Sequence, residues 1–173
     1  MTPIRNIKYP PIKTPSIKKL PETLIYRRPD IINAKGHKFA SFVLFNTKNN
    51  NKTFMRCRPE KITRDKQENI PSLFISNIIS SPQKCGLGTK MLDFARNFSK
   101  KIGCNGYFHL IADDCYTPNS IPHIFYWKYG MNTGFRRYND KLDFFVMMNK
   151  KATYKDFPHL EMYYPPIKNP KFW

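Results

Sequence analysis

The stretch SLFISNIISSPQKCGLGT, residues 72–89, decides how we expect this chain to fold. Its first half is a short apolar run rich in β-branched residues, which is typical of a buried strand. The run leads into a turn with Gly86 and Gly88, where the missing Cβ atoms would let a phosphate approach the backbone. The unpaired N–H groups of a following helix, and the positive end of its dipole, would point at the same place. The sequence therefore predicts a phosphate site between a strand and a helix.

The segment after the glycine turn predicts that helix and a second buried strand. Apolar residues recur there at helical spacing, at Met91, Leu92, Ala95 and Phe98. Gly103 stands where a left-handed residue often ends a helix. Residues 107–112 are another short apolar run. Because a strand, a helix and a strand of these lengths form a right-handed crossover, we expect a parallel strand pair at the centre of a sheet.

The flanking segments predict antiparallel strands around this centre. Residues 38–45 and 53–58 are typical of two strands joined by an asparagine-rich turn, and the charged residues 61–69 predict a loop. Residues 133–138 and 142–148 predict a second hairpin. We therefore expect an α/β fold with a mixed, mostly antiparallel sheet, a central parallel strand pair and flanking helices.

The two ends of the chain differ from this region in composition. Residues 1–36 are rich in proline, lysine and arginine, a composition that disfavours long helices and favours extended structure. Residues 151–173 are rich in aromatic residues and proline. We expect a basic arm over residues 1–36, one folded domain over 37–150 and a C-terminal tail over 151–173.

Charge and cysteine content narrow the classes of function. The 173 residues include 30 Lys and Arg against 12 Asp and Glu, a formal net charge of +18, which favours an anionic partner such as nucleotide phosphates, RNA, a ribosome or a membrane surface. The 4 cysteines and 4 histidines lack the close spacing of metal sites and disulfide frameworks, so we expect free thiols and no metal. No run approaches the ~20 apolar residues of a membrane span. Residues 1–20 lack the apolar core of a secretory signal, so we expect a cytoplasmic protein.

A second stretch, NSIPHIFYWKYGM, residues 119–131, predicts another helix one crossover away from the glycine turn. Asn119 or Ser120 can cap this helix, Pro122 suits its first turn, and Gly130 can end it. The sequence therefore predicts a short capped helix over this stretch.

Together the two stretches resemble the GNAT superfamily, the acyl-CoA-dependent N-acetyltransferases. The family's phosphate motif, Gln/Arg-x-x-Gly-x-Gly/Ala after its fourth strand, is similar to residues 83–88. Its later asparagine, Phe-Tyr pair and Gly-Phe pair are similar to Asn119, Phe125-Tyr126 and Gly130-Met131. Residues 144–150 also resemble the family's last strand. The resemblance covers roughly residues 37–150, and it implies a GNAT-like fold and acetyl-CoA as cosubstrate.

The resemblance also implies which residues hold the coenzyme. Backbone N–H groups of the glycine turn would bind the pyrophosphate of coenzyme A, from Gln83, Lys84, Cys85, Gly86, Leu87, Gly88 and Thr89. Ile78 and Ile79 would pair their backbone with the pantetheine arm as with an extra strand, while their side chains lie in the core. Asn119 would touch the arm, although helix capping alone also explains it. The Lys84 side chain either adds a charge or is a solvated surface lysine.

Tyr126 is the candidate catalytic residue. A thiolate leaves when the acetyl group departs, and a phenol with a pKa near ~10 can protonate it. The alternative is that Tyr126 has only a structural role, as an aromatic residue on one face of the helix. The family often places a glutamate on its fourth strand as base, whereas Ser76 and Asn77 stand there in this chain. Water, or one of a scattered set of side chains with ordinary structural interpretations of their own, would then accept the proton: His109, Asp113, Asp114 or Glu68.

The acceptor side departs further from the family, which usually has a strand and two helices before the sheet hairpin. Residues 1–36 are too rich in proline for two ordinary helices. An open acceptor side favours a macromolecular amine, such as a protein N-terminus, a lysine or a charged tRNA, and the positive charge favours an RNA or ribosomal target. We expect an N-acetyltransferase in which a primary amine attacks acetyl-CoA directly. The alternatives are a non-catalytic acyl-CoA-binding protein and a basic RNA or ribosome interaction protein on the same fold.

Overall fold

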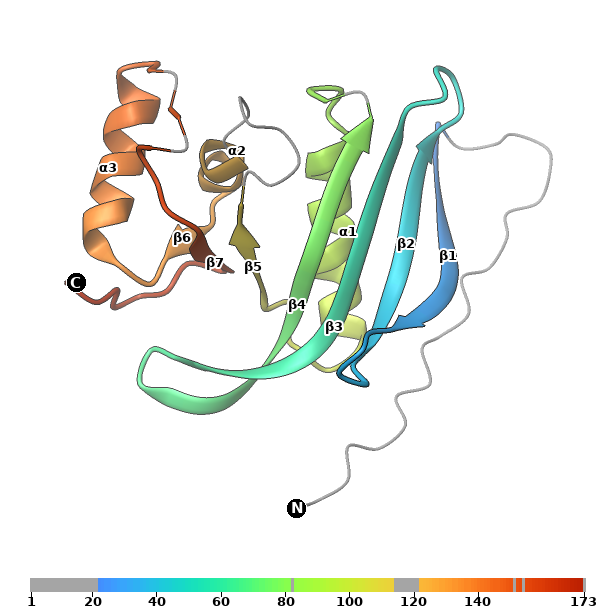
Figure 1. The fold of residues 1–173 in the computed structure, drawn as a ribbon, viewed down its shortest axis with the longest axis horizontal. Helices are drawn as coiled ribbons and strands as arrows, with labels where there is room; N and C mark the ends of the chain where they lie inside the picture. Colours follow the sequence, from blue (N-terminus) through green and yellow to red (C-terminus); the bar gives the residue numbers. More distant parts are fainter. Residues whose placement is uncertain (1–21, 82, 114–121, 151, 154, 173) are drawn as a thin grey trace.

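The frame of the protein is a seven-stranded sheet with the strand order β1-β2-β3-β4-β5-β7-β6 (Figure 1). The computed structural model describes residues 22–81, 83–113, 122–150, 152–153 and 155–172. In chain order the elements are β1 (Thr23–Ile32), β2 (Lys38–Asn46), β3 (Lys52–Arg64), β4 (Gln67–Ser81), α1 (Leu87–Lys101), β5 (Phe108–Ala112), α2 (Pro122–Lys128), β6 (Asn132–Thr133), α3 (Arg136–Met147) and β7 (Leu160–Tyr164). Strands β4 and β5 pair in parallel, and every other pair of these strands is antiparallel. The predicted α/β class and the mostly antiparallel sheet with a central parallel pair are confirmed.

The centre of the sheet follows the sequence prediction closely. The apolar run 73–80 lies within β4, α1 begins directly after the glycine turn, and β5 returns beside β4. The apolar face of α1 is buried against the sheet, and Gly103 with φ +85° follows the helix as predicted. Each large apolar side chain buried in this way contributes ~1.5–3 kcal/mol. Phe42 of β2 meets the rings of Phe94 and Phe98 edge-on, with 4.9 Å between centroids in both pairs.

The predicted arm over residues 1–36 is wrong for β1, because the residues of this strand belong to the sheet. It pairs with β2 from Thr23↔Asn46 to Ile32↔Lys38. The short turn over residues 33–37 is closed by Asn33 Oδ1, which accepts hydrogen bonds from the backbone N–H groups of Lys35 and His37 at 3.0 and 2.9 Å. Pro29 is tolerated because β1 is an edge strand whose register shifts near this residue. The rest of the predicted arm, residues 1–21, lies outside the described residues.

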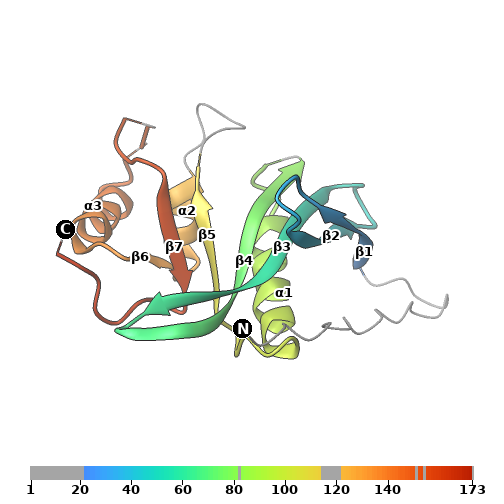
Figure 2. The same ribbon diagram turned by 60° about the horizontal axis from the view of Figure 1, so that its bottom comes forward.

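The predicted loop over residues 61–69 is also wrong, because β3 and β4 continue through it as a two-stranded ribbon. Asp65 and Lys66 turn the chain with φ of +50° and +66°, as the central residues of a tight hairpin require. The buried Arg64 donates hydrogen bonds to the carbonyl oxygens of Pro165 and Pro166 at 2.8 and 3.1 Å. Figure 2 shows the ribbon reaching toward this C-terminal segment. A run of charged residues looks like a loop in the sequence, since the contact that orders it comes from the far end of the chain.

The predicted hairpin over 133–138 and 142–148 is a helix instead. Only β6 is extended, and residues 136–147, including most of the expected last strand, form α3. The buried Asn139, Leu142 and Phe145 recur every three residues, which is a helical stripe. Aromatic and β-branched residues at the surface of α3 suggested strands, and the helical periodicity overrides that propensity.

The segment 151–173, predicted as a tail, contributes strand β7 to the sheet. β7 lies between β5 and β6 and pairs with both. Its residues alternate, so that Leu160 and Met162 enter the core while Glu161 and Tyr163 turn to the other face. The fold therefore includes residues on both sides of the predicted domain 37–150.

The sheet has one covered and one open face along β1–β4. Helix α1 packs against β2, β3, β4 and β5, whereas α2 packs on β5 and α3, and α3 packs on β6 and α2. In Figure 1 helix α1 lies behind β3 and β4, so the face toward the viewer carries no helix of the described residues. Within the described part of the chain, none of the helices has the length and apolar character needed to cross a membrane.

Candidate functional site

Strands β4 and β5 run side by side for only part of their length. Their pairing joins Leu73↔Phe108, Phe74↔His109 and Ile75↔Leu110, and it goes no further among the described residues. Strand β4 nevertheless continues to Ser81 and remains paired with β3 on its other side. Figure 1 shows the two strands diverging toward the glycine turn. The β5-facing edge of residues 78–81 therefore has no partner strand in the described chain, and an extended ligand could pair there as an added strand.

A β-bulge lies at the point of divergence. Arg56 pairs with Asn77 while the next residue, Cys57, pairs with Ile75, so Ser76 is the extra residue of β4. Its hydroxyl donates a hydrogen bond to the Arg56 carbonyl at 3.3 Å. A bulge bends and twists its strand, which here turns β4 away from β5.

The bulge also resets which side chains of β4 face the core. Ile78 packs against the hydrophobic core, whereas Ile79 is 41 % exposed. The prediction that both side chains lie in the core is therefore confirmed for Ile78 and wrong for Ile79. Their predicted backbone role depends on the free edge of β4 and is unaffected by this difference.

The glycine turn presents uncapped donors at the start of α1. Gly86 is the N-cap residue, with φ +77°, and the helix start has neither a side-chain cap nor an acidic residue in its first turn. The first intrahelical bond runs from the Lys90 N–H to the Gly86 carbonyl at 3.4 Å, and the N–H groups of residues 87–89 have no backbone acceptor among the described residues. Such donors, together with the helix dipole, favour an anion by ~0.3–1 kcal/mol at an exposed position.

Gly86 and Gly88 have different structural roles. Gly86 adopts a left-handed conformation that glycine accepts without strain, and a Cβ there would meet open space. A Cβ on Gly88 would lie 3.0 Å from Cζ of Phe125, so this glycine allows α1 and α2 to approach closely. Neither observation requires a phosphate, and the predicted access of a phosphate to the backbone stays a prediction.

Tyr126 is the residue after Phe125 and belongs to the hydrophobic core. Its side chain is 7 % exposed, and the centroids of the two rings are 5.2 Å apart. Burial raises the pKa of Tyr126, so its phenol stays protonated throughout the neutral range. Tyr126 can therefore donate a proton or a hydrogen bond, and it cannot serve as a base at neutral pH.

His109 is engaged in the sheet on the face opposite α1. It is 2 % exposed, and its Nδ1 shares a 2.8 Å hydrogen bond with Ser72 Oγ. Its Nε2 lies 3.6 Å from Glu60 and 3.7 Å from Glu161. Burial, and secondly the charge of Arg58, lower the pKa of His109 to about 4, so the imidazole is neutral at pH 7. A buried imidazole of low pKa is a weak acceptor for the proton of an amine.

Glu68 and Asp113 differ in their distance from the glycine turn. Glu68 lies at the far end of β4, about 40 Å along the strand from Ser81 at ~3.3 Å per residue. Asp113 directly follows β5, and its Oδ2 lies 3.3 Å from His159 Nδ1. Because β4 and β5 are parallel, their carboxyl ends meet at one edge of the sheet, and the glycine turn follows β4 at that edge. Among the predicted candidates that the structure describes, Asp113 is thus the carboxylate at this edge of the sheet. Asp114 and Asn119 lie outside the described residues.

Two features of the site escaped the sequence prediction. The bulge at Ser76 has no local sequence signal, because it arises from the register of two long strands. His159 was overlooked because it lies in the segment predicted as a tail, although it directly precedes the alternating residues of β7.

Two of the described cysteines, Cys57 and Cys104, are buried thiols. Cys57, Cys85 and Cys104 are free thiols as predicted, and Cys115 lies outside the described residues. Burial raises the pKa of Cys57, and it raises that of Cys104 to about 11, which keeps both protonated. Over the described part of the chain, no group of three or more His, Cys, Asp or Glu side chains could hold a metal ion.

Comparison of the chain with protein-family models, with curated proteins and with solved structures found no match. The function is therefore inferred from the geometry of β4, the glycine turn and α2.

Proposed function

We propose that the protein is an acetyl-CoA-dependent N-acetyltransferase with a GNAT-like fold. The observation that carries this proposal is the continuity of two binding elements. The unpaired edge of β4 over residues 78–81 leads directly to the uncapped N-terminus of α1. The first element suits an arm that contains amide groups, and the second suits a pyrophosphate at the end of that arm. Coenzyme A has these two parts in this order.

Each part of the coenzyme has a proposed place. The pyrophosphate lies against the turn and the N–H groups of Leu87, Gly88 and Thr89, and the exposed Lys84 supplies a nearby charge. The pantetheine arm pairs with the backbone of Ile78 and Ile79. The thioester then lies near Ser76, where β4 and β5 separate.

The reaction is a direct attack of a primary amine on the thioester carbonyl carbon. The new C–N bond forms as the carbonyl becomes tetrahedral, the C–S bond then breaks, and the thiolate leaves with the bonding electrons. Tyr126, which stays protonated because it is buried, donates to the departing sulfur. The nitrogen loses a proton to the Asp113–His159 pair at the carboxyl end of β5, either directly or through water. The products are an N-acetyl amide and coenzyme A.

The open face of the sheet supports a large acceptor. Strand β1 joins β2 through residues 33–37, so no helix separates these strands. The acceptor side in the described chain thus lacks the two helices that wall it in the GNAT pattern. A protein N-terminus, a lysine side chain or an aminoacylated RNA has room to approach.

Coenzyme release measured over a panel of amines and peptides tests the activity. We expect acetyl-CoA-dependent turnover by the wild type, and a fall of about 10²–10⁴-fold in kcat for Tyr126→Phe with little change in acetyl-CoA affinity. Tyr129→Phe is the matched control, since Tyr129 lies on the same segment and its hydroxyl bonds to Asp93 at 2.8 Å. Full activity of Tyr126→Phe would remove this residue as the acid.

The second candidate function is a non-catalytic acyl-CoA-binding protein. It is favoured by the absence of a carboxylate at residues 76 and 77 of β4, where the GNAT pattern often has its base. Binding of acetyl-CoA without turnover on any acceptor would favour this second function over catalysis.

A further inference from the structure

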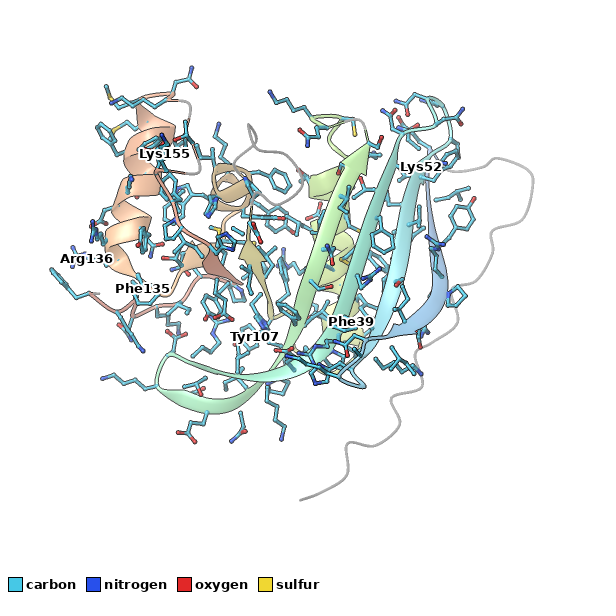
Figure 3. All side chains as sticks on the ribbon, in the orientation of Figure 1. Phe39, Lys52, Tyr107, Phe135, Arg136 and Lys155 are labelled. Carbon is cyan, nitrogen blue, oxygen red and sulfur yellow. The ribbon has the colours of Figure 1, made fainter. Side chains whose placement is uncertain are left out.

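The open face of β1–β4 carries an ordered set of cationic and aromatic side chains. Opposite residues form rows across the strands: Arg28, Ser41 and Arg56 make one row, and Tyr26, Val43, Phe54 and Ile79 make the next. Lys52 follows in the third row, paired with Phe45. In Figure 3 the labels of Lys52 and Phe39 mark opposite ends of this face. We call Tyr26, Arg28, Val43, Lys52, Phe54 and Arg56 the open-face patch.

The positive charges of the open-face patch are not neutralised by the described part of the protein. Arg58, farther along β3, forms an ion pair with Glu60. No carboxylate among the described residues lies within ion-pair distance of Arg28, Lys52 or Arg56. The Nε atom of Arg56 is buried and finds no hydrogen-bond partner there either. Three cations on one sheet face therefore attract an anionic ligand.

Aromatic rings lie between these cations. Tyr26 is 49 % exposed and Phe54 is half-buried in the same row. Since they stand on strands two apart, their backbones are separated by ~10 Å. The Arg56 guanidinium lies 5.5 Å from the centroid of the Phe54 ring, and Lys52 Nζ lies 5.9 Å from that of Phe45. Two of the three cations, Lys52 and Arg56, thus stand beside a ring.

This arrangement matches one kind of polyanion better than others. Single-stranded nucleic acid offers phosphates for cations and unstacked bases for aromatic side chains, and sheet faces with exposed rings can bind it in this way. An acidic peptide supplies the negative charge without flat rings. A duplex keeps its bases stacked, so the Tyr26 and Phe54 rings would have nothing to stack on.

We propose that the open-face patch binds a single-stranded nucleic acid, with bases on Tyr26 and Phe54 and phosphates on Arg28, Lys52 and Arg56. The N-terminus of α1 does not contribute to this surface, because α1 packs on the opposite face. The proposal therefore stands whether or not the protein transfers acetyl groups.

Fluorescence anisotropy with a labelled 12-nucleotide single-stranded RNA tests the proposal on the full chain. With three phosphates neutralised, log Kd rises with log salt at a slope of about 2, so that binding weakens roughly 20-fold between 50 and 200 mM salt. Tyr26→Leu, which keeps an apolar side chain on an exposed edge position, weakens binding about tenfold through lost stacking. Arg28→Ala with Arg56→Ala weakens it further and reduces the salt slope to about 0.7.

A charge-matched control separates this surface from the general positive charge. Lys100→Ala with Lys101→Ala removes two exposed cations from the last turn of α1 and leaves the open face intact. We expect this control to change RNA affinity less than twofold. Equal losses in the two double variants, full affinity of a folded Tyr26→Leu, or equally tight binding of a duplex or of poly-glutamate would each overturn the proposal. Melting curves of every variant establish that it is folded.

Discussion

Strands β2 and β3 present one chemistry toward α1 and another away from it. The residues that face α1 are buried and mostly apolar, among them Phe42, Leu44, Met55 and Cys57. The alternate residues of the same strands include Ser41, Phe54 and Arg56 and form the open face. The groups that we propose to bind anions differ in the same way. Beside the core they are backbone N–H groups at the start of α1, whereas on the open face they are side chains.

This difference separates two kinds of binding within one sheet. A site made of backbone donors depends on conformation and tolerates changes of side chain, and it is confined to one helix end. A surface made of arginine, lysine and aromatic residues depends on those side chains and weakens with salt. Substitutions that affect one face and spare the other therefore test the two kinds of binding separately.

The largest expected difference is between the losses of stability that two substitutions in β2 cause. Phe42→Ala empties the contact with Phe94 and Phe98 in the core and should lower the free energy of unfolding by about 3–5 kcal/mol. Phe45→Ala, on the open face of the same strand, should cost about 1 kcal/mol because its ring is only half-buried. Urea denaturation measures both. Equal losses would contradict the assignment of one covered and one open face.

A smaller effect, on how the free energy of unfolding depends on pH, is expected from His109, which is buried on the side of the sheet opposite α1. Its pKa in the folded protein is about 4, below the ~6.5 of the unfolded chain. Between about pH 4 and about pH 6.5 the unfolded state therefore binds a proton that the folded state does not bind. The contribution of the neutral His109 to the free energy of unfolding is complete above pH ~6.5 and is lost as the pH falls toward 4. The wild type should lose about 1–2 kcal/mol more than His109→Gln between pH 7 and pH 5. Parallel pH curves for the two proteins would contradict the neutral buried imidazole.

Gly88→Ala should lower the free energy of unfolding still less, and it should weaken ligand binding at the start of α1. The new methyl group would lie 3.0 Å from the Phe125 ring, so this ring must move by a few tenths of an ångström. We expect a loss of about 1 kcal/mol and weaker acetyl-CoA binding. The double variant Gly88→Ala with Phe125→Leu provides the control, because the smaller side chain leaves room for the methyl group. An unrescued double variant would show that the close approach of α1 and α2 is not what Gly88 provides.

Local periodicity was enough to predict the parallel centre of the fold. The alternation and length of residues 73–80, the helical spacing from Met91 to Phe98 and the left-handed Gly103 are properties of short windows, and the structure retains all of them. The order of strand, glycine turn, helix and parallel strand, on which the candidate site depends, follows from these windows.

Elements that depend on distant contacts could not be predicted in this way. Strand β1 contains Pro29 and is ordered by pairing with β2. The ribbon around Asp65 is held by the backbone N–H of Lys168, at 2.7 Å from its Oδ1. The bulge at Ser76 depends on the register of β3 against β4. In α3, surface aromatic residues hid the stripe of Asn139, Leu142 and Phe145.

The most direct test of the central claim is calorimetric titration of acetyl-CoA into the wild type, Thr89→Glu and Thr89→Gln. Thr89 is an exposed residue in the first turn of α1, where no acidic residue occurs. A glutamate there interacts favourably with the helix dipole, so the melting temperature of the free protein should equal or exceed that of the glutamine control. The same charge repels a bound pyrophosphate, and we predict that Kd rises at least tenfold, about 1.4 kcal/mol, for Thr89→Glu while Thr89→Gln stays close to the wild type. Absence of acetyl-CoA binding to the wild type, or equal affinity of the two variants, would contradict a coenzyme site at the N-terminus of α1.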